Sequence, residues 1–147
     1  ILELGSSALV PTFAITYEIR DEIVGGITPR VKRLINDVID KMLANNANAY
    51  RQGVPMGWGT DIDLEGFQLA PFLEFQARRD MGMTPLEMLK QATIDSARIV
   101  GLDAMTGSIK IGKTADLIVL PGQPEKNYAD LTVKPEMVFA AGQRFNG

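Results

Sequence analysis

The stretch TPRVKRLINDVIDKM (residues 28–42) decides how the first part of the chain is organised, because it predicts a long helix between two apolar segments. Thr28 is a good helix N-cap, and Pro29 suits the first helical position since its missing N–H would be unpaired there in any case. Apolar residues then recur at spacings of three and four, which gives one apolar stripe. The stripe consists of Val31, Leu34, Ile35, Val38, Ile39 and Met42. We expect the helix to run to about residue 52, where Gly53 ends it.

Apolar segments flank this helix on both sides. ALVPTF (residues 8–13) is typical of a buried strand, and Pro11 within it indicates a strand end or edge. VPMGWGTD (residues 54–61) is a second short apolar segment, which ends in two glycines and an aspartate. We expect residues 16–26 to form a mixed connection. An order of strand, helix and strand indicates a parallel sheet.

The helical pattern continues after the second apolar segment. A helix is predicted at about residues 67–79, a capping box formed by Thr84 and Glu87 opens another, and a short helix at about 94–100 ends at Gly101. A parallel sheet needs both faces covered and more than two strands, so two strand–helix units are too few. We therefore expect the first part of the chain to be a slice of a larger α/β structure.

The last part of the sequence has the short period of β structure. Strands are predicted at residues 107–113, 115–121 and 136–145, joined by turns rich in glycine and proline. Gly142 would provide the turn of a closing hairpin. Asp116 is expected to be a turn or strand-start residue, since aspartate is common at such places.

The composition excludes several kinds of site. The sequence contains no histidine and no cysteine, which removes disulfides, thiolate nucleophiles and Ser-His-Asp arrangements. An all-oxygen metal site stays possible. The net charge of −3 argues against a nucleic-acid partner, and no apolar run is long enough for a membrane span. There is no signal-peptide pattern, so we expect a cytoplasmic protein. A small-molecule substrate is expected as its partner if the chain belongs to a hydrolase.

Asp61 is the candidate catalytic residue. It follows an apolar segment at the carboxyl end of a predicted parallel strand, where α/β proteins place their catalytic groups. Gly57 and Gly59 beside it would let a substrate or metal approach the backbone closely. The alternative is an aspartate that makes a turn or caps the next helix. A calcium loop starting at Asp61 is disfavoured, because Phe72 occupies the position of its bidentate acid.

Two motifs of the tail carry a family resemblance. GMTPLEMLKQATIDSARIVGL (residues 82–102) and GSIKIGKTADLIVL (residues 107–120) resemble the carboxyl end of the metal-dependent amidohydrolases, in the imidazolonepropionase-like and Xaa-Pro-dipeptidase-like branch. Gly59-Thr60-Asp61 lies where that family has the end of its eighth barrel strand. The resemblance covers residues 53–147 well and the first fifty residues more loosely.

The resemblance implies an α/β fold, namely a (β/α)8 barrel of the TIM type with a small β-sandwich. Residues 1–103 would be the last βα units and the carboxyl-terminal helices of the barrel, and residues 104–147 would be sandwich strands. A divalent metal, zinc in the first place, would be held by histidines upstream of Ile1. Asp61 alone maps onto the family's site, as a metal ligand and as the general base that takes a proton from the attacking water. No metal is expected on this chain alone.

Two functions from different classes follow. The first is a hydrolase acting on C–N bonds in an amide, cyclic amide or dipeptide-like substrate, with this piece inactive alone. The alternative is a non-enzymatic β-rich interaction module or a pseudoenzyme piece, whose unpaired β edges would favour a homo-oligomer. Many amidohydrolases carry a histidine shortly after the aspartate, and residues 63–72 contain none. Glu74, on the predicted helix, is expected at the surface or as the anchor of a loop.

Overall fold

The computed structural model describes residues 7–23 and 25–145. The chain divides into two compact units, Ile1–Met83 (unit 1) and Thr84–Gly147 (unit 2), which are described separately. The predicted domain division after residue 103 stays a prediction. Within the described ranges, no helix is both long enough and apolar enough to cross a membrane.

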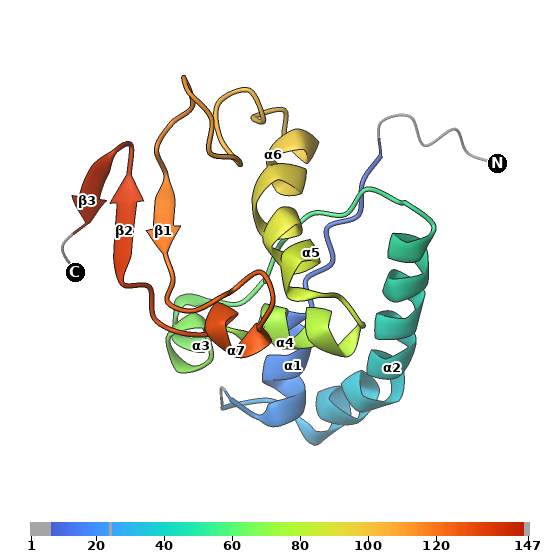
Figure 1. The fold of residues 1–147 in the computed structure, drawn as a ribbon. Helices are drawn as coiled ribbons and strands as arrows, with labels where there is room; N and C mark the ends of the chain where they lie inside the picture. The colour runs from blue at the N-terminus through green and yellow to red at the C-terminus, as the bar shows by residue number, and fades with distance from the viewer. Residues whose placement is uncertain (1–6, 24, 146–147) are drawn as a thin grey trace. The chain divides into compact units, whose positions relative to one another are not determined.

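Unit 1 consists mainly of helices (Figure 1). They are α1 (Ala14–Asp21), α2 (Pro29–Arg51), α3 (Leu64–Leu69) and α4 (Leu73–Asp80). Helix α1 packs against both α2 and α4. Its buried face and the residues around it form the core of the unit, with Phe13, Ala14, Tyr17, Met56, Leu73 and Ala77 among the buried side chains.

Helix α2 has the predicted boundaries. The Thr28 hydroxyl accepts a hydrogen bond from the Val31 N–H at 3.4 Å, and Gly53 follows the helix with a φ of 80°, which favours glycine. The predicted apolar stripe is buried only in part. Ile39 is buried, whereas Val31 and Leu34 are exposed on the first turns of the helix.

Two other predictions for unit 1 are wrong. Helix α1 covers the first residues of the segment that was expected to be an irregular connection. No side chain caps its N-terminus, so the sequence gives no capping signal for it. The single helix expected at residues 67–79 is split into α3 and α4 at Pro71. Proline disfavours the α conformation in the residue before it, and Ala70 accordingly has φ −145° and ψ 68°.

Unit 2 begins with a continuous helical segment made of α5 (Pro85–Lys90), the π-helical turn η1 (Gln91–Asp95) and α6 (Ser96–Ile99). The capping box is confirmed: the Glu87 N–H donates to the Thr84 hydroxyl, and the Thr84 N–H donates to the Glu87 carboxylate at 2.7 Å. The helix predicted at residues 94–100 is therefore the last part of a longer one.

A three-stranded antiparallel sheet follows in the order β1 (Leu117–Val119), β2 (Met137–Ala140) and β3 (Gln143–Phe145) (Figure 1). The short helix α7 (Tyr128–Leu131) lies between β1 and β2 in the sequence. Ala140 pairs with Gln143 across the predicted hairpin turn. Residues 107–113 form turns and irregular chain where a strand was expected, because the glycines at 107 and 112 have φ of 81° and 87° and interrupt any extended run.

Candidate functional site

Asp61 follows a short parallel pairing between the first segment of unit 1 and the segment after α2. The Leu9 N–H donates to the Pro55 carbonyl at 2.9 Å, and the Gly57 N–H donates to the Leu9 carbonyl at 2.8 Å. These bonds form the parallel bridge between Leu9 and Met56. The pairing is shorter than the predicted strands, and Leu9 is exposed. The chain direction nevertheless agrees with a parallel arrangement that ends just before Asp61.

Asp61 has a left-handed backbone with a φ of 55°, and it is exposed. The left-handed region costs most L-residues roughly 1 kcal/mol or more, although aspartate tolerates it better than most. The residue before it is fixed by α1, because the Ile15 N–H donates to the Thr60 carbonyl at 3.2 Å. Helix α3 is capped by Asp63, whose carboxylate accepts from the Gly66 N–H at 2.9 Å. Asp61 therefore occupies a turn and presents its carboxylate at the surface, while Asp63 takes the capping role.

A buried ion pair lies beneath this turn. The Arg78 guanidinium contacts the Glu74 carboxylate at 2.7 Å, and the two side chains are 0% and 2% exposed. Glu74 also accepts a hydrogen bond from the Ala14 N–H at 2.8 Å. The expectation of Glu74 at the surface is thus wrong, and that of a loop anchor is right. Arg78 was not predicted at all; its spacing of four from Glu74 on α4 is the only local signal for the pair.

Burial and the contact between the two side chains act in opposite directions on the charges of this pair. Desolvation raises the pKa of the Glu74 carboxyl, and the attraction of Arg78 and the Ala14 N–H act against that rise. Desolvation likewise lowers the pKa of the Arg78 guanidinium, and the Glu74 carboxylate opposes it. A guanidinium is not deprotonated in proteins, so Arg78 keeps its positive charge beside the Glu74 carboxyl. Removing one partner of a buried ion pair destabilises the fold, because it leaves the other charge buried without compensation.

A second buried acid of unit 1 has a different environment. Glu18 is 5% exposed, and burial raises its pKa, with further contributions from the nearby carboxylates of Asp63 and Glu65. Its carboxylate lies against Gly66, where an added Cβ would clash with it. Within the described residues, the Glu18 Oε2 atom is buried with no hydrogen-bond partner. Asp63 and Glu65 thus place two further carboxylates near the buried Glu18 at the start of α3.

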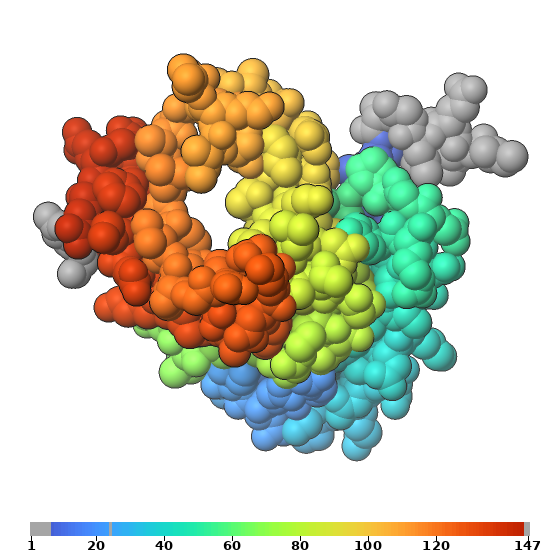
Figure 2. All heavy atoms as spheres, in the orientation of Figure 1, coloured from blue at the N-terminus to red at the C-terminus, as the bar shows by residue number. Residues whose placement is uncertain are grey.

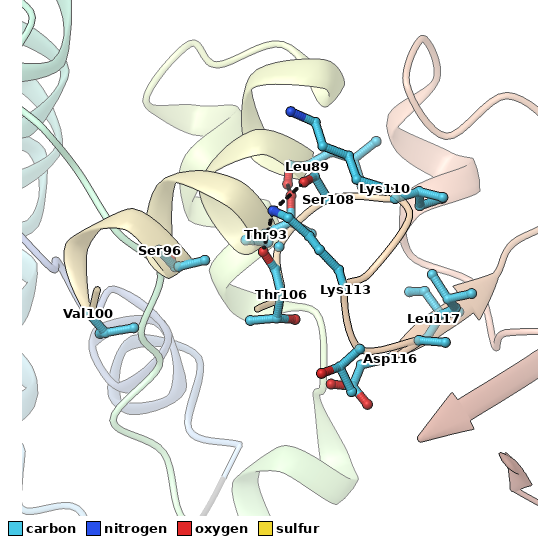
Figure 3. Close-up of a pocket in the computed structure, with 17 residues that line it drawn as sticks. Leu89, Thr93, Ser96, Val100, Thr106, Ser108, Lys110, Lys113, Asp116 and Leu117 are labelled. Atoms are coloured by element: carbon cyan, nitrogen blue, oxygen red, sulfur yellow. Dashed lines mark hydrogen bonds between the residues drawn. The ribbon is translucent and has the colours of Figure 1, made fainter. Parts of the chain in front are cut away.

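Unit 2 contains a cavity of about 730 Å³ between the helical segment and the chain that leads into β1 (Figures 2 and 3). Its lining includes Leu89, Thr93, Val100, Ile109 and Leu117 and is mostly apolar. Lys113 points toward Ser108 in Figure 3, and its ammonium donates to the carbonyls of Asp103 and Thr106 and to the Ser108 hydroxyl at 2.7 Å.

The polar groups of this cavity are engaged in holding the loop. The three donors of the Lys113 ammonium match its three acceptors. Asp116 accepts a hydrogen bond from the Ala141 N–H at 2.8 Å, so it links the start of β1 to the hairpin turn as expected for a strand-start residue. Neither side chain is placed for chemistry, and Asp61 stays the candidate of this chain.

The donor set for a metal ion is limited. Among residues 7–23 and 25–145, no group of three or more His, Cys, Asp or Glu residues is arranged to hold a metal ion. The exposed carboxylate of Asp61 has the right chemistry for one ligand of a divalent metal, since carboxylate oxygen binds zinc as well as harder ions. The residues present therefore fit one position of a metal site.

The chain belongs to the amidohydrolase family, whose profile matches residues 14–145. It is 32% identical over 104 residues to an imidazolonepropionase of Shouchella clausii, which covers 68% of this chain and 23% of that protein. It is 38% identical over 86 residues to an ochratoxinase of Aspergillus niger, covering 58% of this chain and 18% of that protein. A crystal structure of a prolidase in complex with N-methylphosphonate-L-proline matches with a TM-score of 0.81 and 27% identity, over 98% of this chain and 36% of that one.

These similarities confirm the expected family and the α/β amidohydrolase fold of the TIM-barrel type. The chain spans less than a quarter of the length of the curated relatives and about a third of that solved structure. These similarities therefore cover only one part of those enzymes.

Proposed function

We propose that this chain is the carboxyl-terminal part of a cytoplasmic, metal-dependent hydrolase that cleaves a C–N bond in an amide, cyclic amide or dipeptide-like substrate. On this proposal residues 104–147 contribute strands to a small β-sandwich, and the chain is inactive alone. Two of the relatives described above, an imidazolonepropionase and a prolidase, have names of enzymes that act on such bonds. The observation that carries the proposal is the place of Asp61. This residue is exposed, has a left-handed backbone conformation and follows the segment that makes the parallel pairing.

Asp61 would act as a metal ligand and as the general base. An aspartate is a competent proton acceptor when it lies within hydrogen-bond reach of the water that attacks the substrate. When bound, a divalent metal, zinc in the first place, supplies Lewis acidity that makes this water easier to deprotonate. The left-handed backbone at φ 55° supports the assignment, because strained conformations cluster at functional sites. The remaining ligands would come from residues before Ile1.

The partners follow from the same proposal. The substrate would be a small molecule, without nucleic acid or membrane. Strands β1 and β3 are the two edges of the sheet in unit 2, and such edges can pair with another chain. A homo-oligomer formed through them is a proposal that light scattering of the full-length protein would test.

The experiment is an Asp61→Asn substitution in the full-length protein that carries this chain. We expect kcat for a panel of Xaa-Pro dipeptides, N-acyl amino acids and cyclic amides to fall by about 10²- to 10⁴-fold, which is the usual worth of a positioned base. Elemental analysis of the wild-type protein is expected to find a bound divalent metal. The matched control is Asp63→Asn, since asparagine keeps the helix cap. An Asp61→Asn protein with the wild-type kcat would overturn the assignment.

A further inference from the structure

The parallel pairing before Asp61 is interrupted by a proline. In a parallel ladder, the bonds made by Leu9 would be followed by a donation from the N–H of residue 11 to the Gly57 carbonyl. Residue 11 is proline and has no N–H to donate. Buried carbonyl groups are normally paired, so another donor is needed at this point.

The Arg78 side chain supplies that donor. Its Nη2 atom donates to the Gly57 carbonyl at 3.2 Å and to the Pro11 carbonyl at 3.0 Å, one on each segment of the pairing. The guanidinium lies 5.3 Å from the ring centre of Phe13 and 5.2 Å from that of Trp58, so aromatic side chains from both segments flank it. Arg78 thus joins the two segments where the backbone ladder cannot continue.

Glu74 extends this connection to the residue before Asp61. Its Oε1 accepts from the Arg78 Nε at 2.8 Å, and its Oε2 accepts from the Ala14 N–H at 2.8 Å. The next residue along the chain, Ile15, donates its N–H to the Thr60 carbonyl at 3.2 Å. A continuous series of contacts therefore runs from the buried pair, through the start of α1, to the peptide group that precedes Asp61.

We propose that Glu74 and Arg78 are positioning residues for Asp61: they take the place of the ladder bond that Pro11 cannot make and thereby hold the turn on which the Asp61 carboxylate is presented. This inference rests on the proposed function for its catalytic consequence. The geometry asks for arginine in particular. Its guanidinium reaches the Glu74 carboxylate through Nε and the two carbonyls through Nη2, two nitrogens held at a fixed separation, whereas lysine would have to reach all three acceptors from one nitrogen on a flexible stem.

The first test is Arg78→Lys in the full-length protein, which keeps the charge beside Glu74. Amide hydrogen exchange of the peptides covering residues 55–62, measured on protein stripped of metal, is expected to become at least about 10-fold faster. In the metal-loaded protein kcat is expected to fall by about 10- to 100-fold with little change in KM, because misplacement of a reacting group by about 1 Å has such consequences. Arg20→Lys is the matched control.

Arg20 is a suitable control because it has the same kinds of partner at the surface. Its guanidinium contacts the Asp21 carboxylate at 2.6 Å and lies 3.9 Å over the Tyr17 ring, with the side chain 29% exposed. We expect Arg20→Lys to leave both the exchange of residues 55–62 and kcat unchanged. An equal effect of the two substitutions would overturn the proposal.

The second test is rescue by Pro11→Ala. Alanine restores an N–H that can donate to the Gly57 carbonyl, so adding Pro11→Ala to Arg78→Lys is expected to recover most of the lost protection and at least about 3-fold in kcat. A general loss of stability would not recover this way, because replacing proline by alanine gives the unfolded chain more freedom. If Arg78→Lys alone does not fold, recovery of folding by Pro11→Ala supports the proposal and its failure overturns it.

The outcomes separate this inference from the proposed function. Unchanged exchange of residues 55–62 in a folded Arg78→Lys protein overturns the positioning role even where Asp61→Asn is inactive. Failure of Pro11→Ala to restore protection also overturns it. An Asp61→Asn protein with full kcat overturns the proposed function, and with it the catalytic consequence of the pair, whatever the exchange experiment shows.

Discussion

The two units of this chain support their backbones with different kinds of polar contact. In unit 1 the buried Glu74 and Arg78 bond to main-chain groups of residues 14, 11 and 57, which are far from them in sequence. In unit 2 most such contacts are local and close to solvent. Thr84 and Glu87 cap each other, and Lys113 bonds to carbonyls within ten positions of itself.

This difference shows where each unit is vulnerable. Water replaces a lost partner at an exposed cap or loop, so the cost of removing one contact is small. A buried charge that loses its partner has no such replacement. The unit that carries the candidate catalytic residue is therefore the one that depends most on a single pair of side chains.

The largest expected effect contrasts two arginines. Arg78→Met leaves Glu74 buried and unpaired and should lower the opening free energy of unit 1 by about 3–5 kcal/mol. Arg98→Met removes the exposed i,i+3 pair with Asp95, in which Arg98 is 62% exposed, and should cost unit 2 less than about 1 kcal/mol. Native-state hydrogen exchange measures the opening free energy of each unit separately, from the peptides that belong to that unit. Similar losses in the two units would break the comparison.

The next effect concerns a close packing contact of unit 2. Gly107 has a φ of 81°, and a Cβ added there would lie 2.7 Å from the Ala97 Cβ. Gly107→Ala should therefore destabilise unit 2 by about 2–3 kcal/mol, from overpacking together with the left-handed conformation. Gly112→Ala is the control, because its φ of 87° is similar and nothing lies within 4 Å. Its cost should be about 1 kcal/mol. Equal thermal shifts for the two variants would contradict the steric explanation.

A smaller effect is expected at the capping box. Thr84→Ala removes the hydroxyl that accepts from the Glu87 N–H and should cost about 1 kcal/mol, seen as faster exchange of the first turn of α5. Thr84→Ser keeps the hydroxyl and should cost a few tenths of this. A Thr84→Ser variant as damaged as Thr84→Ala would point away from capping and toward packing of the methyl group.

The smallest expected effect is a gain, and it depends on pH. The raised pKa of Glu18 in the folded protein means that its stabilising contribution is present below the pKa of the unfolded chain and is lost as pH rises through the folded pKa. Stability is therefore lost toward neutral pH, and Glu18→Gln, whose side chain does not ionise, should stabilise unit 1 by about 1 kcal/mol. The gain should disappear below about pH 4, where both states bind the proton. A gain that is constant between pH 4 and 7 would exclude the charge as its cause.

Much of the fold follows from local sequence patterns. The boundaries of α2, the capping box at Thr84 and the hairpin turn at Gly142 each depend on a few neighbouring residues, and each is found as predicted. Helix α1 and the break at Pro71 were missed. The first lacks a capping side chain, and in the second one helix was predicted straight through Pro71 although proline interrupts a helix from within.

The candidate site likewise contains one residue that was named from the sequence and one that was not. Asp61 was predicted from the sequence because a strand pattern, two glycines and a family motif surround it within a few residues, and its role stays a prediction. Arg78 was not found, because an arginine on an amphipathic helix is usually at the surface. Its role depends on Pro11 and Gly57, which are brought to it only when the chain folds.

The sequence by itself determined the family, the parallel order of the first segments and the long helix α2, and it named Asp61 as a candidate whose role stays a prediction. These features follow from short motifs and from the spacing of apolar residues along the chain. Only the tertiary structure decided which buried charges hold the Asp61 turn and that Asp63, rather than Asp61, caps the next helix. The physical reason is that a missing proline N–H creates an unpaired carbonyl whose donor can come from anywhere in the chain, and spacing in the sequence does not say from where.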